Sequence, residues 1–306
     1  MLYPTNNTMS NTTSNPSSDA AQIDALSADY RGGKLNRRDF LARLAVITGS
    51  MAAAHLLVEK SGLAQVISQK ETEKGTIRVS GEDVSFSNGD LNLGGYLVAP
   101  SGNGPFPAVV VIHENRGLNE HTRDVARRFA VEGFVALAPD ALARIGGTAS
   151  MKTPNETRSA IGTVTPEQAL ADLEAALIYL DTLPNVRKGH LGSVGFCWGD
   201  ARSFALTLNS DKVRGSVVFY GSAPPTAELV NVKAPVLGLY GELDTRITSA
   251  VPEVAAAIQA AGKSFDSKIY KGANHAFFND TGERYAPTAA ADAWAKAVGF
   301  LREKLK

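Results

Sequence analysis

The chain has 306 residues, enough for one large α/β domain with an appendage or for two average domains. Lys+Arg 31 balance Asp+Glu 31, so no global field attracts nucleic acid or an anionic membrane. A hydrophobic content of 44% is typical of globular proteins, and a lone cysteine excludes an intramolecular disulfide and a zinc site with several cysteine ligands. That cysteine is either a buried core residue or a reactive thiol.

Residues 1–35 are rich in Ser, Thr and Asn and show no sustained apolar period, which predicts a disordered N-terminal segment. Residues 36–64 contain the pair Arg37-Arg38, the dipeptide Phe40-Leu41 and a mostly apolar run. This segment resembles a twin-arginine export signal, which implies the export machinery as a partner and a periplasmic location. A surface amphipathic helix carrying an arginine pair is the alternative.

The apolar run ends near Val58 and is interrupted by Arg43 and His55, so it does not predict a membrane span. Two weak small-residue cleavage sites, Gly62-Leu63-Ala64 and Ala52-Ala53-Ala54, follow or overlap it. We expect the mature protein to begin near residue 65 and to fold as one domain over residues 65–306.

The start of that domain has short β-rich runs typical of an antiparallel meander, at 77–80, 83–86 and 91–99. Continuous apolar runs then predict strands buried on both faces, at 108–112, 134–138, 191–195, 216–220, 235–240 and 265–270. Helical patterns lie between and after them, at 123–132, 166–183, 198–208, 251–261 and 287–305. This alternation predicts a mostly parallel central sheet with an antiparallel N-terminal edge and helices on both faces. Residues 145–165 are predicted to be a Gly/Thr/Ser-rich loop long enough to cap a site.

The lone cysteine lies at the centre of Gly195-Phe196-Cys197-Trp198-Gly199, after an apolar strand and before a helical pattern. In that context the central residue occupies a tight strained turn, and a side chain at either glycine would collide with neighbouring backbone. The turn would present the sulfur above the sheet edge at a helix N-terminus, which favours the thiolate. A buried structural cysteine remains the alternative.

A carboxylate and a histidine follow at the ends of later strands. Asp244 comes after the strand at 235–240, and His275 comes after the strand at 265–270. The order Cys, Asp, His is the one that a nucleophile–acid–base set takes in this kind of sheet. Histidine would exchange protons with the sulfur and the leaving group, and the aspartate would fix its tautomer. Glu242 competes with Asp244 but lies nearer the strand, so Asp244 is preferred.

These motifs resemble the dienelactone hydrolases of the α/β-hydrolase fold. The likeness covers roughly residues 75–305 and also includes His113 to Leu118, Ala138 to Arg144 and His275-Ala276-Phe277. It implies that Cys197, Asp244 and His275 are the catalytic residues, and that Glu114 contacts the resting thiol and helps to free it as thiolate. A surface salt bridge between Glu114 and Arg116 is the alternative for that carboxylate.

The backbone N–H groups of Trp198 and Asn115 are predicted to form the oxyanion hole. No cofactor is expected, and no metal, because Gly117 breaks the H-E-x-x-H spacing that starts at His113. The resemblance also implies a substrate carboxylate bound by two arginines. One matches Arg144, but Asn279 occupies the position of the other, which leaves Arg284 as a substitute.

We therefore expect a hydrolase that cleaves a small ester or lactone through an acyl-thioester on Cys197. The alternatives are a general carboxylesterase and a non-catalytic or redox-sensing protein that uses the same thiol. Asp200 after the turn suits a helix start, but its charge would oppose ionisation of the thiol.

Overall fold

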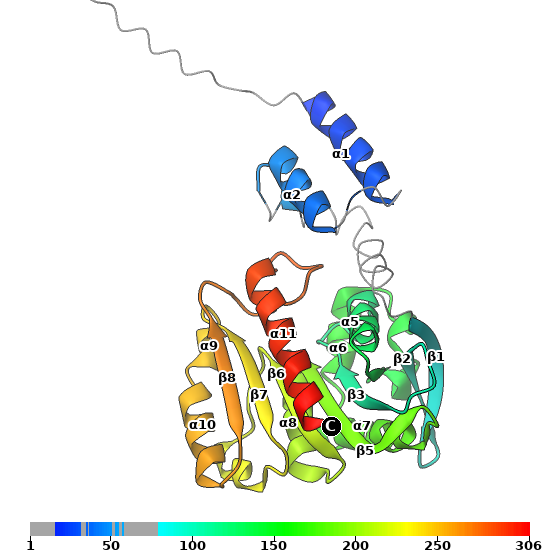
Figure 1. The fold of residues 1–306 in the computed structure, drawn as a ribbon, viewed down its shortest axis with the longest axis vertical. Helices are drawn as coiled ribbons and strands as arrows, with labels where there is room; N and C mark the ends of the chain where they lie inside the picture. The colour runs from blue at the N-terminus through cyan, green and yellow to red at the C-terminus, as the bar shows by residue number, and fades with distance from the viewer. Residues whose placement is uncertain (1–15, 32–34, 36, 51–52, 55–56, 58–78) are drawn as a thin grey trace, which may run out of the picture. The chain divides into compact units, whose positions relative to one another are not determined.

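The computed structural model describes residues 16–31, 35, 37–50, 53–54, 57 and 79–306 (Figure 1). The chain divides into two compact units, residues 1–66 and 67–306. The predicted disorder of residues 1–15 and the candidate cleavage site at Gly62-Leu63-Ala64 lie outside the described residues, as does Ala52 of the other candidate.

The first unit contains helices α1 (Pro16–Arg31) and α2 (Arg37–Thr48). Helix α1 differs from the disorder predicted for its composition. The rings of Tyr30 and Phe40 lie 4.7 Å apart between the two helices, and Leu26 and Leu44 are buried as well. Helix α1 is therefore stabilised by packing its apolar side chains against α2, because a helix of this length and composition is only marginally stable alone.

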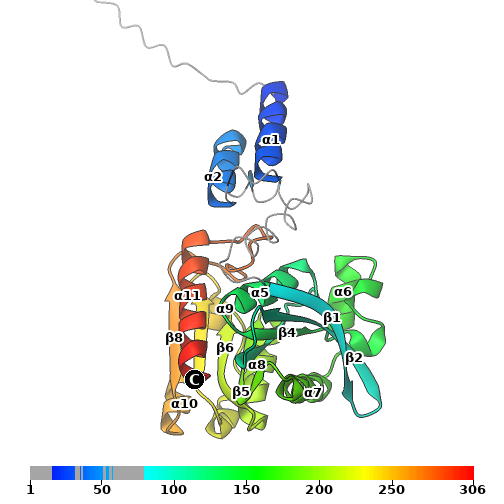
Figure 2. The same cartoon turned by 45° about the vertical axis from the view of Figure 1, so that its right-hand side comes forward.

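The second unit is built on one sheet of eight strands in the order β1-β2-β4-β3-β5-β6-β7-β8 (Figures 1 and 2). The strands β1 and β2 are antiparallel to each other, β2 is antiparallel to β4, and the remaining pairs are parallel. The strands are β1 (Val79–Asn88), β2 (Leu91–Pro100), β3 (Phe106–Ile112), β4 (Val135–Pro139), β5 (Val186–Phe196), β6 (Val213–Phe219), β7 (Val236–Gly241) and β8 (Phe265–Tyr270). This topology confirms the predicted α/β-hydrolase architecture with an antiparallel edge.

Helices cover both faces of the sheet (Figures 1 and 2). They are α5 (Glu120–Val131), α6 (Pro154–Ile161), α7 (Pro166–Thr182), α8 (Trp198–Asn209), α9 (Thr245–Thr248), α10 (Val251–Ala260) and α11 (Pro287–Lys304), with 3-10 turns η1 (Ala143–Ile145), η2 (Thr148–Ser150) and η3 (Thr226–Asn231). Val109 and Val111 of β3 pack in the core under α5 and α11, whereas Val110 and Ile112 pack under α7 and α8. Such alternation of buried side chains makes these strands apolar throughout.

Two predictions differ from the structure here. The runs at 79–80 and 83–86 belong to one strand, because Gly81 leaves room for the ring of Tyr96 across the hairpin and pairing with β2 continues past it. Residues 77 and 78 of the first predicted run lie outside the described residues. The predicted loop 145–165 contains helix α6, which Thr153 caps by accepting a hydrogen bond from the Glu156 N–H at 3.1 Å. A proline after a capping threonine is a helix-start signal that composition alone obscured.

Candidate active site

Cys197 lies in the turn between β5 and α8 with backbone angles of φ 54 and ψ −106, a conformation that a residue with a side chain rarely adopts. A Cβ at Gly195 would lie 2.2 Å from the carbonyl oxygen of Gly199. A Cβ at Gly199 would lie 2.5 Å from the carbonyl oxygen of Ile112. Both glycines are therefore required for the close approach of β5, α8 and β3 that presents this cysteine at the sheet edge.

The structure brings the three residues predicted as nucleophile, base and acid into one contact chain. His275 Nε2 lies 3.1 Å from Cys197 Sγ, and His275 Nδ1 lies 2.6 Å from Asp244 Oδ2. Glu242, the competing carboxylate, instead accepts a hydrogen bond from the Gly272 N–H at 2.8 Å. The parallel strands β5, β7 and β8 end at the same edge of the sheet, which is why residues so far apart in the chain meet there.

The surroundings of the sulfur hold it mostly as a thiol at neutral pH. Burial, followed by the negative charge of Glu114, raises the pKa of Cys197 to about 11. The backbone N–H groups of Trp198 and Asn115 act in the opposite direction, because they favour the thiolate and lower its pKa. The two amides predicted for the oxyanion hole therefore both lie close enough to the sulfur to affect its ionisation.

Glu114 is buried behind the thiol and is not part of a surface salt bridge with Arg116. Its Oε1 accepts a hydrogen bond from the Tyr220 hydroxyl at 3.1 Å, and its Oε2 accepts one from Asn279 Nδ2 at 2.7 Å. The thiol hydrogen-bonds to His275, where the resemblance implied a resting contact with Glu114. Glu114 acts on the sulfur through its charge.

Replacing Glu114 by glutamine is expected to lower the pKa of Cys197, because the change removes a negative charge that disfavours the thiolate. At a pH below the pKa of Cys197, which is about 11, the rate of alkylation by iodoacetamide follows the fraction of the thiol that is ionised. At pH 8 we expect alkylation of the Glu114→Gln variant to be on the order of 3- to 10-fold faster than that of the unmodified protein. Glu253→Gln, on the exposed face of α10, is the control and should leave the alkylation rate unchanged. An unchanged or slower rate in Glu114→Gln would contradict the conclusion that the charge of Glu114 raises the pKa of Cys197.

The charge of Asp200 raises the pKa of Cys197, as its position after the turn predicted, although less than burial and Glu114 do. The side chain of Asp200 is completely buried at the start of α8, and neither carboxylate oxygen has a hydrogen-bond partner among the described residues. Burial raises the pKa of Asp200 well above its ordinary value, which favours the protonated carboxyl. Because protonation removes the charge, burial of Asp200 limits its effect on the neighbouring thiol.

Arg144 is not available as a free cation, which differs from its predicted role. Its Nε and Nη2 donate to the two carboxylate oxygens of Asp172 at 2.6 and 2.7 Å, and Asn88 Nδ2 donates to the same carboxylate at 2.7 Å. Arg284 is exposed, and no contact with the triad residues is found for it in the described part of the chain. The structure therefore brings together Cys197, Asp244 and His275 but not the two arginines.

Two neighbours of the site were not singled out by the sequence. Tyr220 follows β6 with φ 43, and its ring meets that of His275 edge-on at 5.3 Å. Asn279 occupies the position of the second arginine that the resemblance implies, and its side-chain amide donates a hydrogen bond to Glu114. The position of Tyr220 at a strand end beside the other site residues is the signal that could have identified it.

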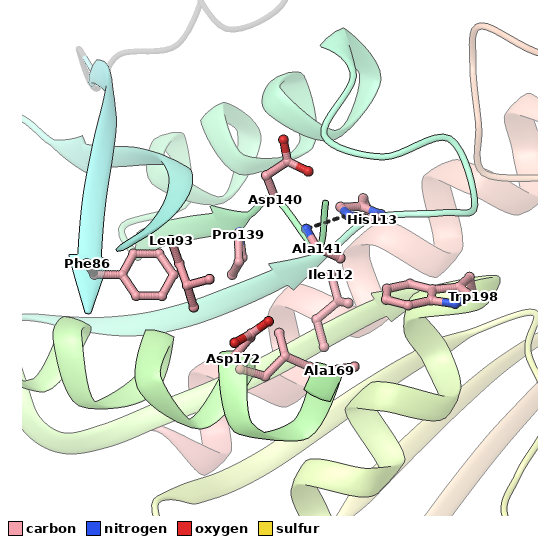
Figure 3. A pocket seen from close by; sticks show the side chains of 11 residues that line it. Phe86, Leu93, Ile112, His113, Pro139, Asp140, Ala141, Ala169, Asp172 and Trp198 are labelled. Carbon is pink, nitrogen blue, oxygen red and sulfur yellow. Dashed lines mark hydrogen bonds between the residues drawn. The ribbon is translucent and has the colours of Figure 1, made fainter. Parts of the chain in front are cut away.

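A pocket opens beside Trp198, between the β1–β2 hairpin and helix α7 (Figure 3). It encloses about 340 Å³ of empty space including its mouth, and its walls are mainly apolar. It is lined by Phe86, Leu93, Ile112, His113, Pro139, Asp140, Ala141, Ala169, Asp172, Leu173 and Trp198. The two carboxylates in this wall are already hydrogen-bonded, Asp172 to Arg144 and Asp140 to Thr148.

No group of three or more His, Cys, Asp or Glu side chains in the described part of the chain is arranged to hold a metal ion. Among the helices that the structure describes, none is both long and apolar enough to cross a membrane.

Residues 93–305 match the model of the dienelactone hydrolase family. The chain is 31% identical over 293 residues to a "Putative carboxymethylenebutenolidase" of Methylorubrum extorquens, covering 92% of this chain and 99% of the relative. It is 34% identical over 256 residues to a protein of the same name from Synechocystis sp., covering 76% of this chain and 100% of the relative.

A solved structure titled "Putative Dienelactone Hydrolase" from Klebsiella pneumoniae superposes with a TM-score of 0.68 at 28% identity, covering 74% of this chain and 99% of that one. The strand order, the strained cysteine turn and the sequence match agree with one another. The chain belongs to the dienelactone hydrolase family.

Proposed function

We propose that this hydrolase cleaves carboxylic esters or lactones with Cys197 as nucleophile, His275 as base and Asp244 as the acid that orients it. The observation that carries the proposal is the continuous contact from Asp244 Oδ2 through the imidazole to the sulfur, at 2.6 and 3.1 Å. Both distances are within reach of proton transfer. The high pKa of the thiol makes a base at hydrogen-bond distance a requirement.

In the proposed reaction His275 Nε2 takes the proton of the thiol as the sulfur attacks the carbonyl carbon. The carbonyl π electrons move onto oxygen, where the N–H groups of Trp198 and Asn115 stabilise the negative charge. The tetrahedral intermediate collapses, the carbon–oxygen bond of the ester breaks, and His275 protonates the leaving oxygen. His275 then takes a proton from water, which attacks the carbonyl carbon of the thioester. The carbon–sulfur bond breaks, and His275 returns the proton to the sulfur, which releases the acid and the free thiol.

We further propose that the substrate group near the pocket is uncharged. Arg144 is bound to Asp172 through two nitrogens, and the neutral Asn279 is bound to Glu114, so neither offers a free charge to a substrate carboxylate. The pocket wall is mainly apolar. The test is to assay the purified chain on p-nitrophenyl acetate and on mono-p-nitrophenyl succinate, which differ in a carboxylate.

We expect kcat/KM for the neutral ester to equal or exceed that for the anionic one. Arg144→Gln should leave the ratio between the two esters unchanged while it destabilises the fold, because Asp172 loses its cation. A marked preference for the succinate ester that disappears in Arg144→Gln would contradict the proposed substrate class. No hydrolysis of either ester would contradict the proposed reaction.

We also propose that the chain is exported through the twin-arginine pathway to the periplasm. The support is the motif itself, since Arg37 and Arg38 are followed by Phe40-Leu41 and a moderately apolar run. Replacing both arginines by lysine keeps the charge and is expected to abolish export, so that the unprocessed chain stays in the cytoplasm. Arg43→Lys in the same segment is the matched control. Cell fractionation and immunoblotting give the outcome, and normal export of the paired-lysine variant would contradict the proposal.

A further inference from the structure

His113, the first residue after β3, is buried, and no hydrogen bond joins it to Cys197, Asp244 or His275 in the described part of the chain. Its Nδ1–H donates to the carbonyl oxygen of Glu114 at 2.6 Å. That carbonyl belongs to the same peptide unit as the N–H of Asn115, which is one of the two amides that favour the thiolate of Cys197. We propose that His113 is a positioning residue that holds the Glu114–Asn115 peptide so that its N–H completes the oxyanion hole.

The geometry of a peptide explains how a bond to one end fixes the other. The peptide group is planar and trans, so its C=O and N–H point in opposite directions. A hydrogen bond that fixes the direction of the Glu114 oxygen therefore also fixes the direction of the Asn115 N–H. A donor on the carbonyl also polarises the peptide and strengthens the N–H as a donor, by about 10–30% per bond.

The imidazole itself is held on two other sides (Figure 3). Its Nε2 accepts a hydrogen bond from the Ala141 N–H at 3.2 Å, so the neutral ring carries its proton on Nδ1. Burial lowers the pKa of His113, which keeps the ring neutral. Its plane stacks on that of Trp198, with ring centroids 5.4 Å apart and an angle of 12° between them.

Trp198 supplies the other N–H of the proposed oxyanion hole. The ring of His113 therefore contacts both sources of the hole, one through a hydrogen bond and the other through the stack. The N–H of Ala141, in the loop after β4, donates to Nε2 and so fixes the ring between Trp198 and the Glu114–Asn115 peptide. This arrangement gives His113 a role in the reaction although it never meets the substrate's reacting atoms.

Three substitutions separate this role from simple core filling. Asparagine places its amide N–H near the position of Nδ1 and preserves the bond to the Glu114 carbonyl. Glutamine reaches toward the position of Nε2 instead, and leucine fills the space without any donor. A residue that only packs would make all three variants differ by size and stability, with no preference for a donor near Nδ1.

The first measurement is hydrolysis of p-nitrophenyl acetate. Removing an oxyanion-hole donor costs about 10²–10³ in kcat, so displacing one through His113→Gln or His113→Leu is expected to lower kcat about 10- to 100-fold with little change in KM. His113→Asn should keep kcat within about 5-fold of the unmodified protein. Alkylation of Cys197 by iodoacetamide develops no oxyanion, so it should fall far less than kcat in His113→Gln and His113→Leu, by no more than the loss of the Asn115 N–H beside the thiolate accounts for.

The second measurement does not require turnover, so it separates this inference from the proposed ester hydrolysis on which its mechanism rests. The sulfur of Cys197 adds to the carbonyl carbon of trifluoroacetone while His275 takes the proton of the thiol, and the π electrons of the carbonyl move onto its oxygen. The resulting hemithioketal places its oxyanion in the hole, and ¹⁹F NMR measures its dissociation constant. We expect His113→Gln and His113→Leu to weaken the adduct about 10-fold or more and His113→Asn to restore it.

Each outcome decides the proposal. If the unmodified protein forms the adduct in a manner that depends on His113 but hydrolyses no ester, the positioning role stands and the proposed hydrolysis fails. If all three variants bind trifluoroacetone and hydrolyse ester as the unmodified protein does, the positioning role is wrong. It is also wrong if His113→Asn is as impaired as His113→Leu, or if the unmodified protein forms no adduct.

Discussion

Replacing Cys197 by alanine is expected to lower kcat for p-nitrophenyl acetate by about 10⁴- to 10⁶-fold, the loss typical of removing a catalytic nucleophile. The physical reason is that no other described nucleophile lies at hydrogen-bond distance from His275 Nε2. Alanine keeps the Cβ that this turn accommodates at φ 54, so the fold should survive. Equal thermal unfolding midpoints for the two proteins would show that the lost activity is chemical.

The same variant separates the enzyme from the redox-sensing alternative. A sensor thiol would react with mild peroxide to form a sulfenic acid on Cys197 and would not need His275 and Asp244. Retention of ester hydrolysis in Cys197→Ala would show that the activity belongs to another group. It would contradict the assignment of the nucleophile directly.

Replacing Asp244 by asparagine is expected to lower kcat by about 10⁴-fold, as in other enzymes with this kind of triad. Asp244 Oδ2 accepts the Nδ1–H of His275 at 2.6 Å, which leaves Nε2 free to accept the thiol proton. An amide donor at this position favours the other tautomer, in which Nε2 carries the proton and cannot act as a base.

Glu242→Gln is the matched control, because Glu242 lies two residues earlier and binds only the Gly272 N–H among the hydrogen bonds found in the described residues. We expect it to keep kcat within about 3-fold of the unmodified protein. The measurement is kcat together with KM for both variants. A larger loss of kcat in Glu242→Gln than in Asp244→Asn would show that Glu242, and not Asp244, orients His275.

The sequence predicts that Cys197, Asp244 and His275 meet at one edge of the sheet, because strand order constrains where they lie. Parallel strands deliver their C-terminal ends to one edge, so the residues after β5, β7 and β8 must lie near one another wherever the intervening helices pack. The glycines around Cys197 carry a steric requirement that the short contacts of Gly195 and Gly199 reproduce. Such local and topological constraints can be derived from one chain.

The sequence does not predict which partner a charged side chain chooses. Arg144 pairs with Asp172 on a helix 28 residues later, and Glu114 is held by Asn279, 165 residues away. Neither pairing follows from periodicity, because any of several carboxylates or amides could have met these groups. The same limit applies to helix α1, because Tyr30 at its end packs against Phe40, which belongs to another helix. The proposal about the charge of the substrate therefore depends on the three-dimensional structure, whereas the hydrolase class could be predicted from the sequence.

The most direct test of the proposed chemistry is the covalent intermediate. The protein is mixed with p-nitrophenyl acetate, quenched in acid within the first turnover, and examined by intact-mass and peptide mass spectrometry. We expect the mass to increase by one acetyl group, located on Cys197, and we expect no such increase in Cys197→Ala. Turnover of the ester without an acyl group on Cys197, or with the acyl group on another residue, would contradict the account.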